Sequence, residues 1–288
     1  MVGKELARKM KIRETIWLWG QDAMSHHRVG SRGENIWNLP GVNQMDPAQG
    51  ARFFGIRNVC RVVMNGRPFP SFENEMEKLR ECSQVVWSVL GDSGSDRAGA
   101  ASDDLDALLA LAGHYPSLKG GVLDDFFRPL SNESGTDKMA RLSLERVREI
   151  RDRLHHAKHP LELWIVIYES ALSESYRSYL ELCDAVTFWT WQGKNLTRLE
   201  DDLKRVFALS PDQKHLGGCY AWDYGAGRPI DMPLLKKQCV LYADYLKKGL
   251  LQGVIVCSNC IADIGLEAAA YIRDWIAEIG DDESPETC

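Results

Sequence analysis

Short apolar runs alternate with amphipathic segments along the whole chain. Eight runs are rich in Val, Ile, Trp and Cys and are apolar almost without interruption. This pattern is typical of β-strands that are covered on both faces. The runs span residues 14–20, 58–64, 84–90, 120–126, 161–169, 184–191, 215–224 and 250–258.

An amphipathic segment follows each run, with apolar residues at the three- and four-residue spacing of a helix. Strands that alternate with helices pair in parallel, and eight such units predict a (β/α)8 TIM barrel. A doubly wound open sheet is the alternative, but it usually carries a glycine-rich loop after its first strand, and "WLWGQDAMSHHRVG" is not such a loop. The expected helices span residues 46–54, 71–82, 102–113, 143–157, 171–182, 196–209, 233–248 and 265–279.

The chain has no linker or low-complexity tract, which predicts one barrel domain over residues 1–280. The acidic tail "DDESPETC" (281–288) is expected to be disordered. Residues 20–47 have almost no helical period. A first βα loop of this length is usually functional or disordered, and in a barrel it lies on the face where active sites form.

Charge and hydropathy exclude several classes of partner. The net charge is −6, and the arginines around residues 146–153 are interleaved with acidic residues, so no nucleic acid partner is expected. No apolar run is long enough to span a membrane. The expected location is the cytoplasm, or the periplasm or exterior if a signal peptide was removed. The oligomeric state is left open.

The cysteines and histidines do not form a recognisable metal or redox motif. Four of the eight cysteines lie in or beside apolar runs and are expected to be buried free thiols: Cys60, Cys183, Cys219 and Cys257. Cys257 and Cys260 have CxxC spacing, but neither a thioredoxin-like context nor a second pair accompanies them. His26 and His27 are adjacent and cannot easily bind one metal. No metal and no cofactor are therefore expected.

Acidic residues stand at the ends of three predicted strands, where the barrel would bring them together. Asp124 and Asp125 end the fourth strand, Glu169 ends the fifth and Asp223 ends the seventh. Alternation along a strand lets only one of Asp124 and Asp125 point fully inward. We predict Asp125 as general acid or base and Asp124 as the residue that orients or tunes it. Glu169 would be nucleophile or second carboxylate, and Asp223 a third candidate or a hydroxyl binder.

Aromatic and polar residues beside these acids predict a sugar site. Trp and Tyr rings offer platforms for the apolar faces of sugars, and carboxylate pairs cleave glycosidic bonds. The expected substrate-binding residues are Trp191, Trp222, Tyr224, Trp19, Asn65, Gln192, and His27 and Arg28 from the first loop.

Simpler interpretations exist for the same residues. Polar groups at a barrel mouth often only meet solvent, Glu169 could cap a helix that begins near Ser170, and Trp191 and Trp222 could be plugs. The favoured function is a carbohydrate-active hydrolase. The alternative is a non-hydrolytic barrel, either a sugar-binding protein or a lyase or isomerase of a small polar substrate, or an inactive family member.

The segment "GGVLDDFF" resembles strand four of the chitinase-type (family 18) glycoside hydrolases. On that pattern Asp125 matches the last aspartate and Phe126 the aromatic residue, while Phe127 stands where the family has its catalytic glutamate. Leu123 likewise replaces an earlier aspartate. "DAVTFWTWQ" resembles the same family's strand six. The resemblance implies a sugar-active barrel without the chitinase mechanism. The whole chain also resembles uncharacterised bacterial barrel proteins, which implies no mechanism.

Overall fold

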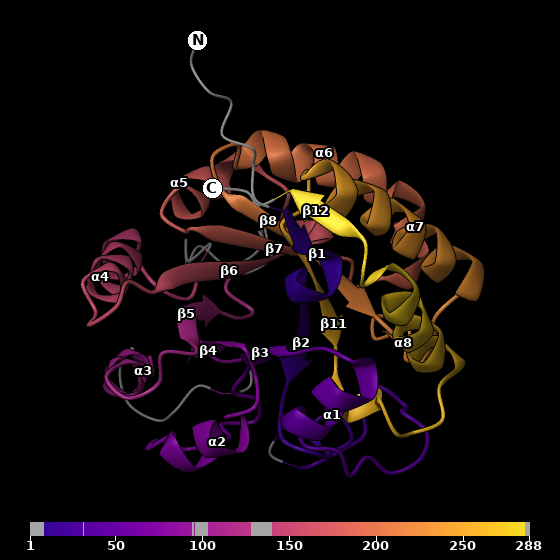
Figure 1. The fold of residues 1–288 in the computed structure, drawn as a ribbon, viewed down its shortest axis with the longest axis horizontal. Helices are drawn as coiled ribbons and strands as arrows, with labels where there is room; N and C mark the ends of the chain where they lie inside the picture. Colours follow the sequence, from indigo (N-terminus) through magenta and orange to yellow (C-terminus); the bar gives the residue numbers. More distant parts are fainter. Residues whose placement is uncertain (1–8, 31, 94, 96–102, 128–139, 286–288) are drawn as a thin grey trace.

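The computed structural model describes residues 9–30, 32–93, 95, 103–127 and 140–285. Eight parallel strands close into a barrel in the order β11-β2-β3-β4-β5-β6-β7-β8, and helices surround them (Figure 1). The predicted (β/α)8 fold is confirmed and the open sheet is excluded. The barrel strands are β2 (Ile16–Gly20), β3 (Asn58–Arg61), β4 (Gln84–Leu90), β5 (Leu118–Leu123), β6 (Glu162–Tyr168), β7 (Ala185–Trp189), β8 (Lys214–Tyr220) and β11 (Gly253–Cys257).

The helices follow the strands as the amphipathic pattern predicts, with one exception. The helix expected over 171–182 is α-helical only at its end, after two 3-10 turns, η2 (Glu169–Ala171) and η3 (Glu174–Tyr176). The hydroxyl of Ser173 accepts a hydrogen bond from the backbone amide of Ser175, and such local bonds compete with a regular helix. The helices are α1 (Pro47–Phe54), α2 (Glu73–Lys78), α3 (Leu105–Ala112), α4 (Leu144–His155), α5 (Arg177–Leu180), α6 (Leu199–Leu209), α7 (Met232–Lys248) and α8 (Glu267–Ile279).

Tryptophan side chains fill the interior of the barrel. Trp17 of β2 meets Trp164 of β6, on the opposite side of the ring of strands, with ring centroids 4.9 Å apart. Two residues further along β2, on the same face of the strand, Trp19 meets Trp189 at 5.3 Å. The interior is therefore a packed core, and the second pair lies nearer the carboxyl ends of the strands.

Replacing Gly218 by alanine is expected to lower the free energy of unfolding by about 1–3 kcal/mol, the usual cost of overpacking. A Cβ atom at Gly218 would lie 2.2 Å from the ring of Trp189, so this tryptophan must move. Urea unfolding measures the effect. Gly113→Ala is the control, because its Cβ would meet nothing closer than 3.4 Å. Equal stability of the two variants would contradict this account of the packing.

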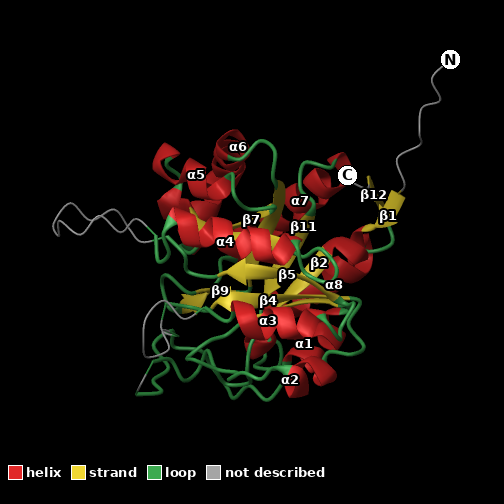
Figure 2. Ribbon diagram, turned by 90° about the vertical axis from the view of Figure 1, so that its left-hand side faces the viewer, coloured by secondary structure: helices red, strands yellow, loops and turns green. Residues whose placement is uncertain are grey.

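Two small sheets flank the barrel. β1 (Lys9–Lys11) pairs with β12 (Glu283–Pro285), and β9 (Trp222–Asp223) pairs with β10 (Arg228–Pro229). Residues 283–285 of the tail that was expected to be disordered form β12, because β1 supplies their backbone with hydrogen-bonding partners, and residues 286–288 lie outside the described residues. Figure 2 shows β9 at one end of the barrel and β1 and β12 at the other.

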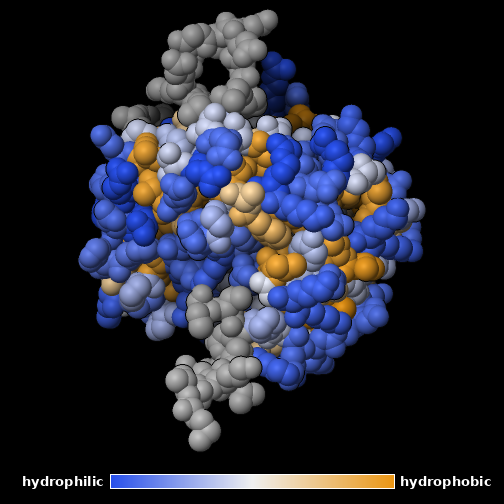
Figure 3. Space-filling model, turned by 90° about the horizontal axis from the view of Figure 1, so that it is seen from above, coloured by the Kyte–Doolittle hydropathy of each residue, from blue (hydrophilic) through white to orange (hydrophobic). Residues whose placement is uncertain are grey.

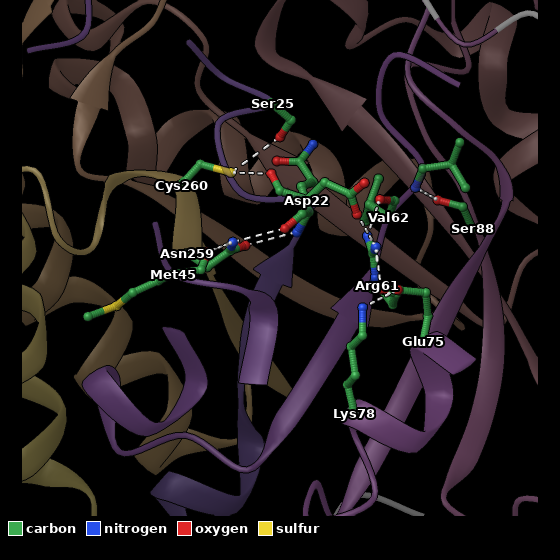
Figure 4. Close-up of polar contacts among 12 residues, drawn as sticks. Asp22, Ser25, Met45, Arg61, Val62, Glu75, Lys78, Ser88, Asn259 and Cys260 are labelled. Carbon is green, nitrogen blue, oxygen red and sulfur yellow. Dashed lines mark hydrogen bonds and ion pairs between the residues drawn. The ribbon is translucent and has the colours of Figure 1, made fainter. Parts of the chain in front are cut away.

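The first βα connection is tied to the barrel by buried polar groups (Figure 4). The Arg61 side chain, 1 % exposed, forms ion pairs with Asp22 and, at 3.0 Å, with Glu75. The Asn259 side chain exchanges two hydrogen bonds of 2.9 Å with the backbone of Gln21. These contacts fix the point where the long loop leaves β2.

The surface is mainly polar. On the face shown in Figure 3, hydrophilic residues predominate and apolar ones form separate small patches. No helix in the described part of the chain is both long and apolar enough to cross a membrane. Exposed large apolar side chains among the described residues are Ile36, Val42, Phe69, Val240 and Leu250.

Candidate active site

A cavity of about 960 Å³ lies at the carboxyl ends of the barrel strands. This is the face on which enzymes of this fold build their active sites. The volume is at the upper end of the range for ligand pockets. Residues at or just after the end of each barrel strand line it: Trp19, Met64, Asp92, Asp124, Tyr168, Trp189, Tyr220 and Cys257.

Seven aromatic residues form one side of the cavity, which we call the aromatic wall. Their rings contact one another in a continuous cluster. Trp191 and Tyr224 are stacked at 5.7 Å with 26° between their planes, and Trp189 lies 4.9 Å from Tyr220. Tyr and Trp rings have apolar faces and one polar O–H or N–H group at the edge, so they offer a ligand both apolar contact and hydrogen bonding. The aromatic wall comprises Trp19, Trp37, Tyr168, Trp189, Trp191, Tyr220 and Tyr224.

Three carboxyl groups form the acidic wall: Asp92 after β4, and Asp124 and Asp125 after β5. Asp124 is 4 % exposed, and its Oδ1 accepts a hydrogen bond of 2.8 Å from the backbone amide of Asp125. Burial raises the pKa of Asp124 well above its usual range, and the neighbouring carboxylates of Asp125 and Asp92 raise it further. Asp124 therefore retains its proton at a pH where an ordinary aspartate is ionised.

Asp125 has a different environment from its neighbour. Its φ of +43° belongs to the left-handed region, so the chain leaves the alternation of the strand at this residue. Its Oδ1 accepts a hydrogen bond of 2.8 Å from the Tyr168 hydroxyl, and its Oδ2 accepts one of 3.1 Å from the amide of Ser93. Burial and the Asp125 carboxylate raise the pKa of Tyr168, which keeps this phenol a donor.

Arg141 holds the backbone under the acidic wall. Its Nη1 donates to the carbonyl oxygen of Gly91 at 2.5 Å and to that of Asp124 at 3.0 Å. The ends of β4 and β5 are thereby joined by one guanidinium group. Asp92 accepts hydrogen bonds from the amide of Asn65, at 3.1 Å, and from the hydroxyl of Ser95.

His26 comes from the first loop and lies buried in the cavity lining. Its Nε2 is bonded to the Gln21 side-chain oxygen, so its Nδ1 accepts the hydroxyl hydrogen of Tyr224 at 2.7 Å. Burial, with a smaller contribution from His27, lowers the pKa of His26 from 6.5 to about 3. The imidazole is therefore neutral in the folded protein and fixes the orientation of Tyr224.

We expect the free energy of unfolding to fall as the pH drops from 6.5 toward 3. The unfolded chain takes up a proton at His26 near the ordinary pKa of 6.5, whereas the folded chain resists it until about 3. This group contributes a slope of about 1.4 kcal/mol per pH unit. Urea unfolding between pH 4 and 6 should show a shallower slope for His26→Gln. The exposed control His114→Gln should keep the wild-type slope, and a wild-type slope in His26→Gln would refute the assignment.

Two predicted catalytic carboxylates bind backbone amides instead of facing open space. Glu169 lines the cavity, but its two oxygens accept from the amides of Trp191 at 2.9 Å and Gln192 at 3.0 Å. Asp223 is buried and is not among the lining residues, and its Oδ1 accepts from the amide of Gly193 at 3.0 Å.

The predicted binding residues divide into two groups. Trp191, Tyr224, Trp19 and Gln192 line the cavity. The other four do not, and the polar side-chain atoms of three of them hold loops together. The Trp222 indole donates to the carbonyl of Trp37, the Asn65 side chain bonds the backbone of Gly30 and Arg28, and His27 bonds the carbonyl of Pro40. The Arg28 side chain is exposed.

Several lining residues were not among the predicted site residues. Phe127 stands where the chitinase-type family has its proton donor, and it lines the cavity as an apolar residue. Tyr220 could have been found from alternation, since it lies two residues before Trp222 near the end of a strand. His26 carried no signal that separated it from His27. The further lining residues include Gln21, Trp37, Asp92, Tyr168, Trp189, Asn195, Arg141 and Arg198.

The cysteines match the prediction of buried free thiols. All seven cysteines in the described ranges are buried and unpaired. Burial raises the pKa values of Cys257 and Cys260, and a protonated thiol is a poor nucleophile. Within the described residues no group of three or more His, Cys, Asp or Glu side chains could hold a metal ion.

Comparison with known proteins gives a structural likeness alone. No protein-family model matches the sequence, and the search of curated proteins gave no match. A chitinase from Ipomoea carnea is 12 % identical, with 91 % of this chain and 99 % of that chain covered and a TM-score of 0.53. A β-mannanase from the blue mussel Mytilus edulis is 11 % identical, with 82 % and 84 % covered and a TM-score of 0.51. The predicted likeness to glycoside hydrolase barrels is thus confirmed for the fold.

Proposed function

We propose that the protein hydrolyses a glycosidic bond in a carbohydrate ligand. The observation that carries this proposal is the pair Asp124 and Asp125, two adjacent carboxyl groups at one cavity in contrasting environments. Burial raises the pKa of Asp124, which suits this carboxyl group to the role of general acid, while Asp125 accepts hydrogen bonds at both oxygens. The aromatic wall supports a sugar as the ligand, and the fold is shared with a chitinase and a mannanase.

In this proposal Asp124 is the general acid. It gives its proton to the glycosidic oxygen as the bond from that oxygen to the anomeric carbon breaks. Asp125 is the second carboxylate, acting on water as a base or on the anomeric carbon as a nucleophile. The sequence predicted Asp125 as general acid or base and Asp124 as the residue that orients it; we assign the acid role to Asp124 because it is the buried member of the pair, while Asp125 accepts hydrogen bonds at both oxygens.

The test is a panel of β-1,4-linked pentasaccharides of glucose, mannose and N-acetylglucosamine, with aryl glycosides of the same sugars. Released reducing ends report hydrolysis, and proton NMR of the first product shows whether the anomeric configuration is retained. Hydrolysis of at least one member supports the proposal. Absence of turnover across the panel, with folded protein and no melting shift, would refute it for these sugars.

A second candidate function is sugar binding without hydrolysis. It is favoured by Glu169, whose two oxygens are both used by backbone amides and are not available as a nucleophile. A shift of the melting temperature without released reducing ends would select this alternative, because ligand binding alone stabilises the folded state.

A further inference from the structure

The loop after β7 has three consecutive backbone amides that donate to side-chain carboxylates. Glu169 Oε2 accepts from Trp191 at 2.9 Å, and its Oε1 accepts from Gln192 at 3.0 Å. Asp223 Oδ1 accepts from the next amide, that of Gly193, at 3.0 Å. Glu169 begins the turn after β6 and Asp223 follows β8, so the loop is held from the strands on both sides.

Further contacts fix the same loop. The carbonyl of Trp191 accepts from the amide of Gly225 at 3.1 Å, and Asn195 donates to Glu169 Oε1 at 3.1 Å. Gly193 is required for this approach, because a Cβ atom there would lie 2.7 Å from Asp223 Oδ2. The backbone around Trp191 is therefore held in one position.

The Trp191 ring is the centre of the aromatic wall. It is half-buried, it lines the cavity and it stacks on Tyr224. The rings of Trp37, Tyr168 and Tyr220 each lie 6.1 Å from it, at steep angles. Its position thus decides the shape of the aromatic wall.

We propose that Trp191 is a stacking subsite for the apolar face of a pyranose ring, and that Glu169 and Asp223 are positioning residues that hold it there. The inference rests on the proposed function in that the ligand is a carbohydrate. A rigid platform binds with a smaller loss of conformational entropy than a mobile one. The two carboxylates thus act on ligand affinity through the backbone of one loop.

The two carboxylates differ in how they tolerate an amide, which gives a sharp test. Glu169 uses both oxygens, so Glu169→Gln places an NH2 group against a backbone donor. Asp223 accepts its two backbone hydrogen bonds through Oδ1, from Gly193 and from Ala226, while its Oδ2 lies 3.8 Å from the exposed Arg228 guanidinium; Asp223→Asn can therefore keep both backbone bonds. If Glu169 or Asp223 were instead a catalytic carboxylate, its replacement by the amide, Glu169→Gln or Asp223→Asn, would abolish that function in either case.

Binding of the panel pentasaccharides is measured by calorimetry in the Asp124→Asn background, in which turnover is expected to be slow. We expect Glu169→Gln, Asp223→Ala and Trp191→Ala each to weaken binding about tenfold, the order of one aromatic contact. Asp223→Asn should stay within about threefold of the parent, as a rescue by the conservative variant. The exposed control Glu174→Gln should match the parent.

Fluorine NMR of protein labelled with 5-fluorotryptophan reports the platform directly. The Trp191 resonance is assigned with Trp191→Phe, and circular dichroism confirms folding. We expect saturating pentasaccharide to shift this resonance, and Glu169→Gln and Asp223→Ala to move it without ligand. When Glu169→Gln is the only substitution and Asp124 is retained, it should raise KM and change kcat less.

Three results would overturn the inference: a Trp191 resonance that no panel member shifts, an Asp223→Asn variant as impaired as Asp223→Ala, or a Glu169→Gln variant that loses kcat alone. The failure of the proposed function is a separate result. Binding with the Trp191 shift but without hydrolysis in the wild type would refute the hydrolase and leave the subsite intact.

Discussion

Asp124→Asn is expected to reduce kcat by about 10²–10⁴-fold, the range that a positioned general acid contributes. Asparagine has nearly the same shape but no proton to give to the glycosidic oxygen. The loss should depend on the leaving group. Aryl glycosides with a strongly acidic phenol leave without protonation, so their hydrolysis should stay close to the wild-type rate. The ratio of kcat for acidic and ordinary leaving groups is the measurement.

The pH profile gives an independent check on Asp124. Activity of the wild type should fall as the pH rises through the raised pKa of this group, because the acid form is then lost. The fall should be absent in Asp124→Asn with an activated aryl glycoside. The exposed control Asp274→Asn should keep the wild-type profile. If Asp125→Asn, rather than Asp124→Asn, shows the dependence on leaving group, the proton donor is Asp125.

Arg61→Met is expected to lower the free energy of unfolding by about 1–3 kcal/mol, because it removes a buried guanidinium from two carboxylates that are themselves only partly buried. The Arg61 side chain is 1 % exposed and faces two carboxylates, Asp22 and Glu75. Without the guanidinium these two negative charges repel each other, and the carbonyl of Val62 loses a donor at 3.1 Å. Urea unfolding with a linear extrapolation measures the loss.

Arg57→Met is the matched control for Arg61. Arg57 precedes β3 and is exposed, and its guanidinium donates to the carbonyl of Glu81 at 3.5 Å. Exposed substitutions of this kind usually change stability by less than about 0.5 kcal/mol. A loss below about 1 kcal/mol in Arg61→Met would show that the buried ion pair contributes little beyond its desolvation cost.

The fold follows from sequence because its strands are long apolar runs and its helices are amphipathic. The run at 84–90 coincides with β4, and the segment at 143–157 contains α4. The pairing of β1 with β12 was missed because each strand has only three residues and no apolar alternation. The spacing of apolar residues over 171–182 predicts a helix, whereas the serines of this segment favour short turns.

The position of the candidate site in the fold was predictable from the sequence, whereas the roles of its individual residues were less so. Strand ends gave Asp124, Asp125 and Trp191, because a parallel barrel brings such ends together. The sequence could not decide which aspartate is buried, since the left-handed φ of Asp125 breaks the alternation on which that choice depends. Nor could it show that Glu169 and Asp223 bind backbone amides, which lie 22 to 30 residues away in the chain.

The pairing of β1 with β12 has a practical consequence for handling the protein. Lys9 and Pro285 are partners in this small sheet, at the end of the barrel away from β9 (Figure 2). A solid support coupled beside either residue would leave the cavity facing the solution. Immobilised protein would then leave the cavity as accessible to ligands as in the free protein, and oriented sensor surfaces could be prepared without altering any residue of the cavity.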